Sequence, residues 1–138
     1  MKKQLLFSVI ILLALSSCQL TVIEEPHVHV DIRDRFLGVF DVEEYSETFD
    51  SYSYYHVEIV ALHGEPNSVI LRNFYGAEID VIAHIEGNYL YIPNQDVGGF
   101  HIEGEGSVSG DRLDLSYSVH DHLAYHDITD YCLSVAWR

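Results

Sequence analysis

Positive charge is scarce in this chain. Its 138 residues include 22 Asp and Glu but only seven Lys and Arg, which gives a formal net charge of −15. The only lysines are Lys2 and Lys3, and the other cations are arginines. Because binding to a phosphate backbone depends on such cations, this composition excludes nucleic acid as a partner. It also excludes electrostatic attraction to anionic lipid headgroups.

Cysteine is scarce as well. Cys18 and Cys132 are the only two, and Cys18 is assigned to a lipid below, so no disulfide framework is expected. Cys132 lies in an apolar segment without the histidine and the cationic setting of a reactive thiol. It is therefore predicted to be a small, buried side chain.

The motifs of the common catalytic classes are absent. The sequence contains no Gly-x-Ser-x-Gly elbow, no P-loop and no His-Glu-x-x-His pair. Glu103 with Glu105, and Asp121 with Asp127, have the residue type needed for glycoside hydrolysis. Chance produces such pairs in so acidic a chain, and we expect neither an enzymatic activity nor a cofactor.

The longest apolar run is too short to cross a membrane. It covers residues 5–15, whereas a bilayer core needs roughly 20 residues. A run of this length after Lys2 and Lys3 is typical of a secretory signal. Residues 15–18 read Leu-Ser-Ser-Cys and resemble the lipobox of bacterial lipoproteins. This resemblance implies removal of residues 1–17 and lipidation of Cys18, with several acyl chains giving a stable anchor.

The lipobox resemblance also indicates a location in the cell envelope. In enteric bacteria an Asp after the lipidated cysteine retains the protein in the inner membrane, so Gln19 favours the outer membrane, at its periplasmic face or on the cell surface. Loss of Lys2 and Lys3 leaves five cations against 22 acids, a formal charge of −17. Contact with the membrane is therefore expected through the lipid on Cys18 alone.

Beyond the signal, residues 18–34 are predicted to be a lipidated tether and residues 35–138 a single β domain. From residue 36 on, short alternating segments rich in β-branched and aromatic residues are separated by Gly, Pro, Asn and Asp, which is typical of strands and turns. Pro93 is expected to end one strand, and residues 96–99 to form a loop. The eight expected strands cover residues 36–45, 52–62, 69–74, 78–85, 89–92, 100–108, 113–119 and 128–137.

Eight strands joined by tight turns, with no amphipathic helix, predict an all-β antiparallel meander. Closure into a lipocalin-like up-and-down barrel would remove both exposed edges, and a two-sheet β-sandwich is the alternative. Gly104 and Gly106 share a face and are expected to relieve crowding or mark a bend. A barrel of eight strands is either filled by side chains or holds one small ligand.

Five segments carry a family resemblance. They are residues 36–40 (FLGVF), 69–74 (VILRNF), 87–95 (GNYLYIPNQ), 102–106 (IEGEG) and 113–119 (LDLSYSV). This pattern resembles the small lipocalin-like (calycin-type) lipoproteins of Bacteroides-type bacteria, a family without a settled activity. Members often have one cysteine early in the domain and one near its end. This chain has only the later one, Cys132, so the family's disulfide is not expected here.

Histidine is the unusual component, with nine residues. His120, His122 and His126 lie close to Asp121 and Asp127, and such a group can bind zinc or another divalent metal. The spacing matches no known metal signature, so solvated loop histidines are the alternative. The histidines expected to be isolated are His56, His63, His84 and His101.

Together these features predict a lipid-anchored binding or accessory module of the cell envelope. Its target would be a small apolar or carbohydrate ligand, or an envelope protein that the abundant tyrosines could contact. The alternatives are a structural envelope lipoprotein without a small-molecule ligand and a low-affinity binder of divalent metals. An open cavity would favour a small ligand, whereas a filled interior with exposed aromatic residues would favour protein interaction.

Overall fold

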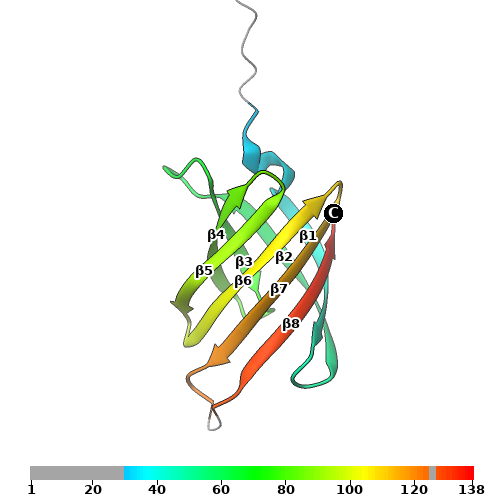
Figure 1. Cartoon of the computed structure of the whole chain (residues 1–138), viewed down its shortest axis with the longest axis vertical. Coiled ribbons are helices and arrows are strands. Elements are labelled where there is room, and N and C mark those ends of the chain that lie inside the picture. Colours follow the sequence, from blue (N-terminus) through cyan, green and yellow to red (C-terminus); the bar gives the residue numbers. More distant parts are fainter. Residues whose placement is uncertain (1–29, 125–126) are drawn as a thin grey trace, which may run out of the picture.

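The computed structural model describes residues 30–124 and 127–138 and forms a closed antiparallel barrel (Figure 1). Each strand pairs with its neighbours in sequence, and the last strand pairs with the first. The strands are β1 (Gly38–Ser46), β2 (Ser51–Ala61), β3 (Ser68–Phe74), β4 (Ile79–Glu86), β5 (Tyr89–Val97), β6 (Phe100–Ser109), β7 (Arg112–Asp121) and β8 (Thr129–Trp137). The predicted lipocalin-like up-and-down barrel is confirmed, and the two-sheet alternative is wrong.

A short 3₁₀ helix, η1 (Ile32–Arg35), precedes β1 and lies across one end of the barrel, which we call the η1 end (Figure 1). Arg33 donates hydrogen bonds to the backbone oxygens of Leu62 and Glu65 in the β2–β3 turn. These bonds fix η1 over the barrel, and Phe36, which follows it, is fully buried. In the described part of the chain, no helix has the length and apolarity needed to cross a membrane.

The barrel interior is built by strict alternation along the strands. In β4, for example, Ile79, Val81, Ala83 and Ile85 are buried while the residues between them are exposed, as expected for side chains that alternate between two faces. Phe36, Phe40, Val69 and Ile92 are 0% exposed, so no water-sized void touches them. Side chains therefore fill the barrel at the η1 end and at its centre.

Strand β5 is longer than the sequence predicts, because Pro93 does not end it. The β5–β6 register shifts between Ile92 and Gln95, and a proline is tolerated at such a bulge. The Gln95 amide bonds both the backbone nitrogen and the backbone oxygen of Ile82 at 3.0 and 2.8 Å. This side chain thereby replaces ladder bonds that β4 lacks. The expected loop at 96–99 is a tight turn, with Val97 paired to Phe100.

The two glycines of β6 relieve crowding against β7. A Cβ atom on Gly104 would lie 2.3 Å from the Tyr117 Cβ and 2.7 Å from the Ser116 carbonyl oxygen. A Cβ on Gly106 would lie 2.6 Å from the carbonyl oxygen of Asp114. Any larger residue would therefore push β6 and β7 apart, which confirms the crowding interpretation.

Candidate functional site

Toward the end opposite η1, the interior of the barrel becomes polar. The buried positions of β1 are, in order, Phe40, Val42, Glu44 and Ser46, and those of β8, in reverse order, are Ala136, Ser134, Cys132 and Asp130. Since β1 and β8 are antiparallel, the polar members of both series lie at the same end. Two carboxyl groups, Glu44 and Asp130, are thus inside the barrel at 3% and 4% exposure.

Glu44 is held by three hydroxyl groups. Its Oε2 accepts a hydrogen bond from Tyr117, one from Tyr55 at 2.5 Å and one from Ser134 at 3.2 Å. Burial raises the pKa of Glu44, and the donors Tyr55 and Ser134 oppose this rise. Burial and the adjacent Glu44 also raise the pKa of Tyr55, so its hydroxyl remains a donor.

Asp130 lies closer to the end of the barrel opposite η1, which we call the open end. Its side chain links β8 to β1 and to the β3–β4 turn. Its Oδ1 accepts a hydrogen bond from Ser46, and its Oδ2 accepts one from the Tyr75 hydroxyl at 2.7 Å. Tyr75 has a φ of 60°, which is uncommon for a bulky residue and indicates local strain. Its ring packs edge-on against Phe100, with centroids 6.0 Å apart. The hydroxyl bond and the ring contact hold Tyr75 in this conformation.

Cys132 lies between the two carboxyl groups and is 1% exposed. Burial, together with the charges of Glu44 and Asp130, raises the pKa of its thiol. A thiol in this setting is neutral and weakly nucleophilic. The prediction of a buried small side chain at this position is confirmed.

A cavity of about 390 Å³ opens next to Asp130, and we call it the mouth pocket. This volume lies within the range of small-molecule sites, roughly 300–1,000 Å³. Its lining residues are Phe49, Tyr75, Phe100, Val119, Asp121, Ala124, Ile128 and Asp130. The walls are therefore aromatic and aliphatic, and two carboxyl groups supply the charge.

The arginines lie elsewhere on the barrel. Arg33 and Arg35 belong to η1, and Arg112 and Arg138 lie where β7 begins and the chain ends, which is also the η1 end (Figure 1). Arg72 pairs with Glu58 at 3.1 Å. No arginine lines the mouth pocket, so acidic groups dominate its electrostatic potential.

The predicted metal ligands are only partly brought together. The rings of His120 and His122 are 4.8 Å apart, but His120 bonds Asp127 through Nε2 at 2.8 Å and Thr129 through Nδ1 at 3.1 Å. His126 lies outside the described residues, so the predicted set of three stays a prediction.

His101 is not isolated, contrary to expectation. Its Nδ1 lies 2.7 Å from Asp96 Oδ1, and His122 Nε2 lies 3.6 Å from the same oxygen. Sequence reasoning missed this group because residues 96–99 were assigned to a loop. In the tight turn that forms instead, Asp96 and His101 are direct cross-strand partners.

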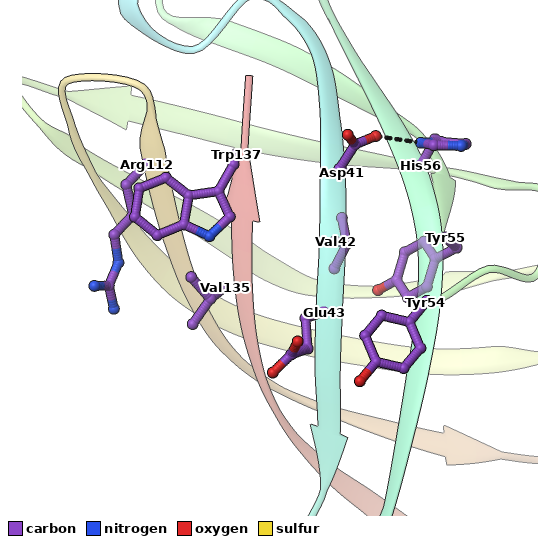
Figure 2. Close-up of a pocket in the computed structure, with 9 residues that line it drawn as sticks. All are labelled: Asp41, Val42, Glu43, Tyr54, Tyr55, His56, Arg112, Val135 and Trp137. Carbon is purple, nitrogen blue, oxygen red and sulfur yellow. Dashed lines mark hydrogen bonds and ion pairs between the residues drawn. The ribbon is translucent and has the colours of Figure 1, made fainter.

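The outer wall carries a second class of candidate surface. A hollow of about 530 Å³ lies over β1, β2, β7 and β8. In Figure 2, Glu43 lies between Trp137 and Tyr54, and the paired side chains of Asp41 and His56 lie on the Tyr54 side. A neighbouring hollow of about 510 Å³ lies between Tyr89 and Tyr91 on one side and Leu133 and Val135 on the other. Tyr54, Tyr89 and Tyr91 are thus exposed on this wall, whereas the hydroxyl groups of Tyr55 and Tyr117 bond Glu44.

Fold and pocket together define a lipocalin-like barrel that is closed by η1 at one end and hollowed at the other. No family model matches the chain, and no curated protein is significantly similar to it. Because one fold hosts many functions, the function is inferred from the chemistry of the site.

Proposed function

We propose that the chain is a lipid-anchored binding module of the cell envelope that takes a small apolar ligand bearing an amino group into the mouth pocket. The observation that carries this proposal is the pairing of an aromatic cavity with Asp121 and Asp130 at the open end of a packed barrel. The lipobox resemblance at residues 15–18 and the resemblance to lipocalin-like lipoproteins support the anchor and the envelope location.

The apolar part of such a ligand would contact Phe49, Tyr75 and Phe100. These rings contribute a large apolar area, and their faces attract an organic cation. Since Phe49 is 56% exposed, it has surface to bury on binding. Burial of apolar area contributes about 25 cal/mol per Å², which favours ligands with a hydrocarbon body.

The carboxyl groups select the charge of the ligand. Asp130 accepts hydrogen bonds from Ser46 and Tyr75 and one from the Cys132 thiol, and a carboxylate with two oxygens can accept about four. An ammonium group would gain charge-assisted hydrogen bonds worth about 1.5–3 kcal/mol each. An anionic ligand would be repelled by Asp121 and Asp130 and by the net charge of the chain.

The test uses residues 30–138, without the anchor, because this range contains η1 and all eight strands of the barrel. N-phenyl-1-naphthylamine serves as a fluorescent apolar probe and is displaced by octylamine, octanol or octanoate. We expect octylamine to displace the probe at a concentration roughly tenfold lower than octanol, and octanoate to be weakest. Equal potency of octylamine and octanoate would contradict the proposed charge selection.

Matched variants locate the probe. Phe49→Ala should weaken probe binding, whereas Tyr54→Ala, which removes an aromatic ring 73% exposed on the outer wall, should not. Asp121→Asn keeps the side-chain oxygen that caps the nitrogens of Leu123 and Ala124 and should reduce the advantage of octylamine over octanol. The reverse result for Phe49 and Tyr54 would place the ligand on the outer wall.

A carbohydrate on the outer wall is the second candidate. It is favoured by the hollow in which exposed Tyr89 and Tyr91 face a floor that contains Ser107, Ser116 and Asp114. Tyrosine rings stack on sugars, and these polar groups can bond their hydroxyls. In this case Tyr91→Ala, and not Phe49→Ala, would abolish retention on an immobilised glycan.

A further inference from the structure

We propose that Asp96, His101 and His122 form a binding site for a divalent transition-metal ion such as zinc, at the rim of the open end of the barrel. Within residues 30–124 and 127–138, this is a group of three metal-ligating side chains whose ligand atoms all lie within 4.8 Å of one another. The site stands independently of the mouth pocket and its ligand.

Three neighbouring segments of backbone fix the positions of these residues. Asp96 on β5 and His101 on β6 are direct cross-strand partners. His122 follows β7, and its backbone nitrogen donates to the Gly99 oxygen at 3.0 Å. The turn between β5 and β6 is formed by Gly98 and Gly99, with φ of 60° and 90°, values that glycine tolerates without strain. The group is therefore built on paired strands and a tight turn.

The two imidazoles converge on one carboxylate oxygen. His101 Nδ1 and His122 Nε2 lie 2.7 and 3.6 Å from Asp96 Oδ1. Zinc bonds its nitrogen and oxygen ligands at about 2.0–2.2 Å in a tetrahedron, which places ligand atoms roughly 3.3 Å apart. The two nitrogen–oxygen separations bracket this value, and all three ligand atoms lie within 4.8 Å of one another. Side-chain rotations that close the widest of these separations would admit an ion. Water would supply the fourth ligand.

The ligand chemistry selects the class of ion. Two imidazole nitrogens and one carboxylate suit zinc, copper or nickel. Calcium and magnesium prefer sites made wholly of oxygen and should bind weakly. The side chains of His101 and His122 are 35% and 51% exposed, and that of Asp96 is 74% exposed, so an ion can enter without opening the barrel.

His120 has a positioning role in this arrangement. Its ring packs edge-on against the His122 ring, with an interplanar angle of 79°. Both of its nitrogens already have partners, Asp127 and Thr129. Its contact orients His122 toward Asp96, and its removal should weaken the site less than removal of a ligand does.

A matched control exists on the outer wall. His56 Nδ1 lies 2.6 Å from Asp41 Oδ1, which reproduces the His101–Asp96 pair, but no third ligating side chain joins it among the described residues. Nonspecific attraction of cations by the acidic chain should affect both pairs equally. In contrast, specific binding at the proposed site should be weakened by changes to Asp96 or His101 and not by changes to the His56–Asp41 pair.

The experiment is calorimetric titration of the full chain, purified in a nonionic detergent, with zinc chloride at pH 7.5 and 150 mM sodium chloride. We expect one ion per chain, and a loss of affinity of roughly tenfold or more in Asp96→Asn, His101→Ala and His122→Ala. His56→Ala should bind as the unchanged protein does. Circular dichroism of each variant separates loss of a ligand from loss of the fold.

Two results would overturn the proposal. Weak binding of several ions that no variant alters would show only attraction by net charge. Strong binding lost in His120→Ala but retained in Asp96→Asn would place the ion in the β7–β8 loop instead. Cobalt gives an independent readout, since a four-coordinate site of this kind should show visible absorption that disappears in Asp96→Asn.

Discussion

Replacing the buried Glu44 by glutamine should change how the stability of the barrel depends on pH. Burial raises the pKa of Glu44, while hydroxyl donors oppose this effect. When a folded carboxyl group has a raised pKa, the unfolded chain releases its proton first as pH increases. The contribution of Glu44 to the free energy of unfolding is therefore fully present below the pKa of the unfolded chain, near 4.3. This contribution is lost as pH rises, until Glu44 in the folded protein has also ionised.

The size of the effect follows from proton linkage. Each unit by which burial raises the pKa removes about 1.4 kcal/mol of stability at high pH. One kcal/mol shifts the melting temperature of a domain of this size by roughly 4–8 °C. Glu44→Gln removes the titration and keeps an oxygen that can accept from Tyr55, Tyr117 and Ser134. It should therefore gain stability relative to the wild type as pH rises from 4.5 to 8.

Glu43→Gln is the control, because Glu43 is exposed on the opposite face of the same strand and loses the same charge. Urea unfolding followed by circular dichroism at several pH values measures both variants. We expect the Glu43→Gln curve to run parallel to that of the wild type and the Glu44→Gln curve to diverge from it. If the wild type instead gained stability over Glu44→Gln with rising pH, the three hydroxyl donors would outweigh burial and our reasoning would be refuted.

Two further predictions concern the backbone and the anchor. Gly104→Ala should destabilise the barrel by about 1–3 kcal/mol in urea unfolding, because its Cβ would overlap Tyr117 and the Ser116 oxygen. Gly87→Ala meets no atom within 4 Å and should be affected only by its φ of 61°, about 1–2 kcal/mol; equal stability of the wild type and Gly104→Ala would disprove the crowding. The Cys18→Ser variant should no longer be recovered in the membrane fraction and should not be labelled by a palmitate analogue. Lipid label that persists in this variant would contradict the proposed anchor.

Much of the fold could be predicted from the sequence, because an antiparallel meander depends mainly on local signals. The expected strands at 78–85 and 89–92, with Gly87 and Asn88 between them, correspond to β4 and β5, which pair as antiparallel neighbours. The prediction that Pro93 ends a strand was wrong, because a residue without an N–H is tolerated at a bulge. The side-chain amide of Gln95 bonds the backbone of Ile82 in β4 in place of Pro93. Compensation of this kind depends on which residue lies opposite and has no local signature.

The candidate site was less predictable. Glu44 and Asp130 were not predicted as interior residues, although the period-two pattern contains the signal. Phe40, Val42 and Glu44 share one face of β1, and Asp130 shares a face of β8 with Cys132. Because the chain has 22 Asp and Glu residues, the sequence alone did not single out these two buried carboxyl groups from the exposed ones. The metal-ligating group could be found only from the register of β5, β6 and β7, which joins Asp96, His101 and His122 across the sheet.

The direction of the barrel links the anchor to the mouth pocket. The described chain enters through η1, and its last residue, Arg138, lies at the same end (Figure 1). Under the proposed lipidation of Cys18, the part of the tether before the described chain, residues 18–29, connects this end to the membrane. These 12 residues span at most about 40 Å. The mouth pocket and the rim residues Asp96, His101 and His122 lie at the end of the barrel opposite this attachment point. Both candidate sites therefore belong to the end of the barrel that is farthest from the proposed attachment point, and the acidic groups there attract cationic ligands and metal ions.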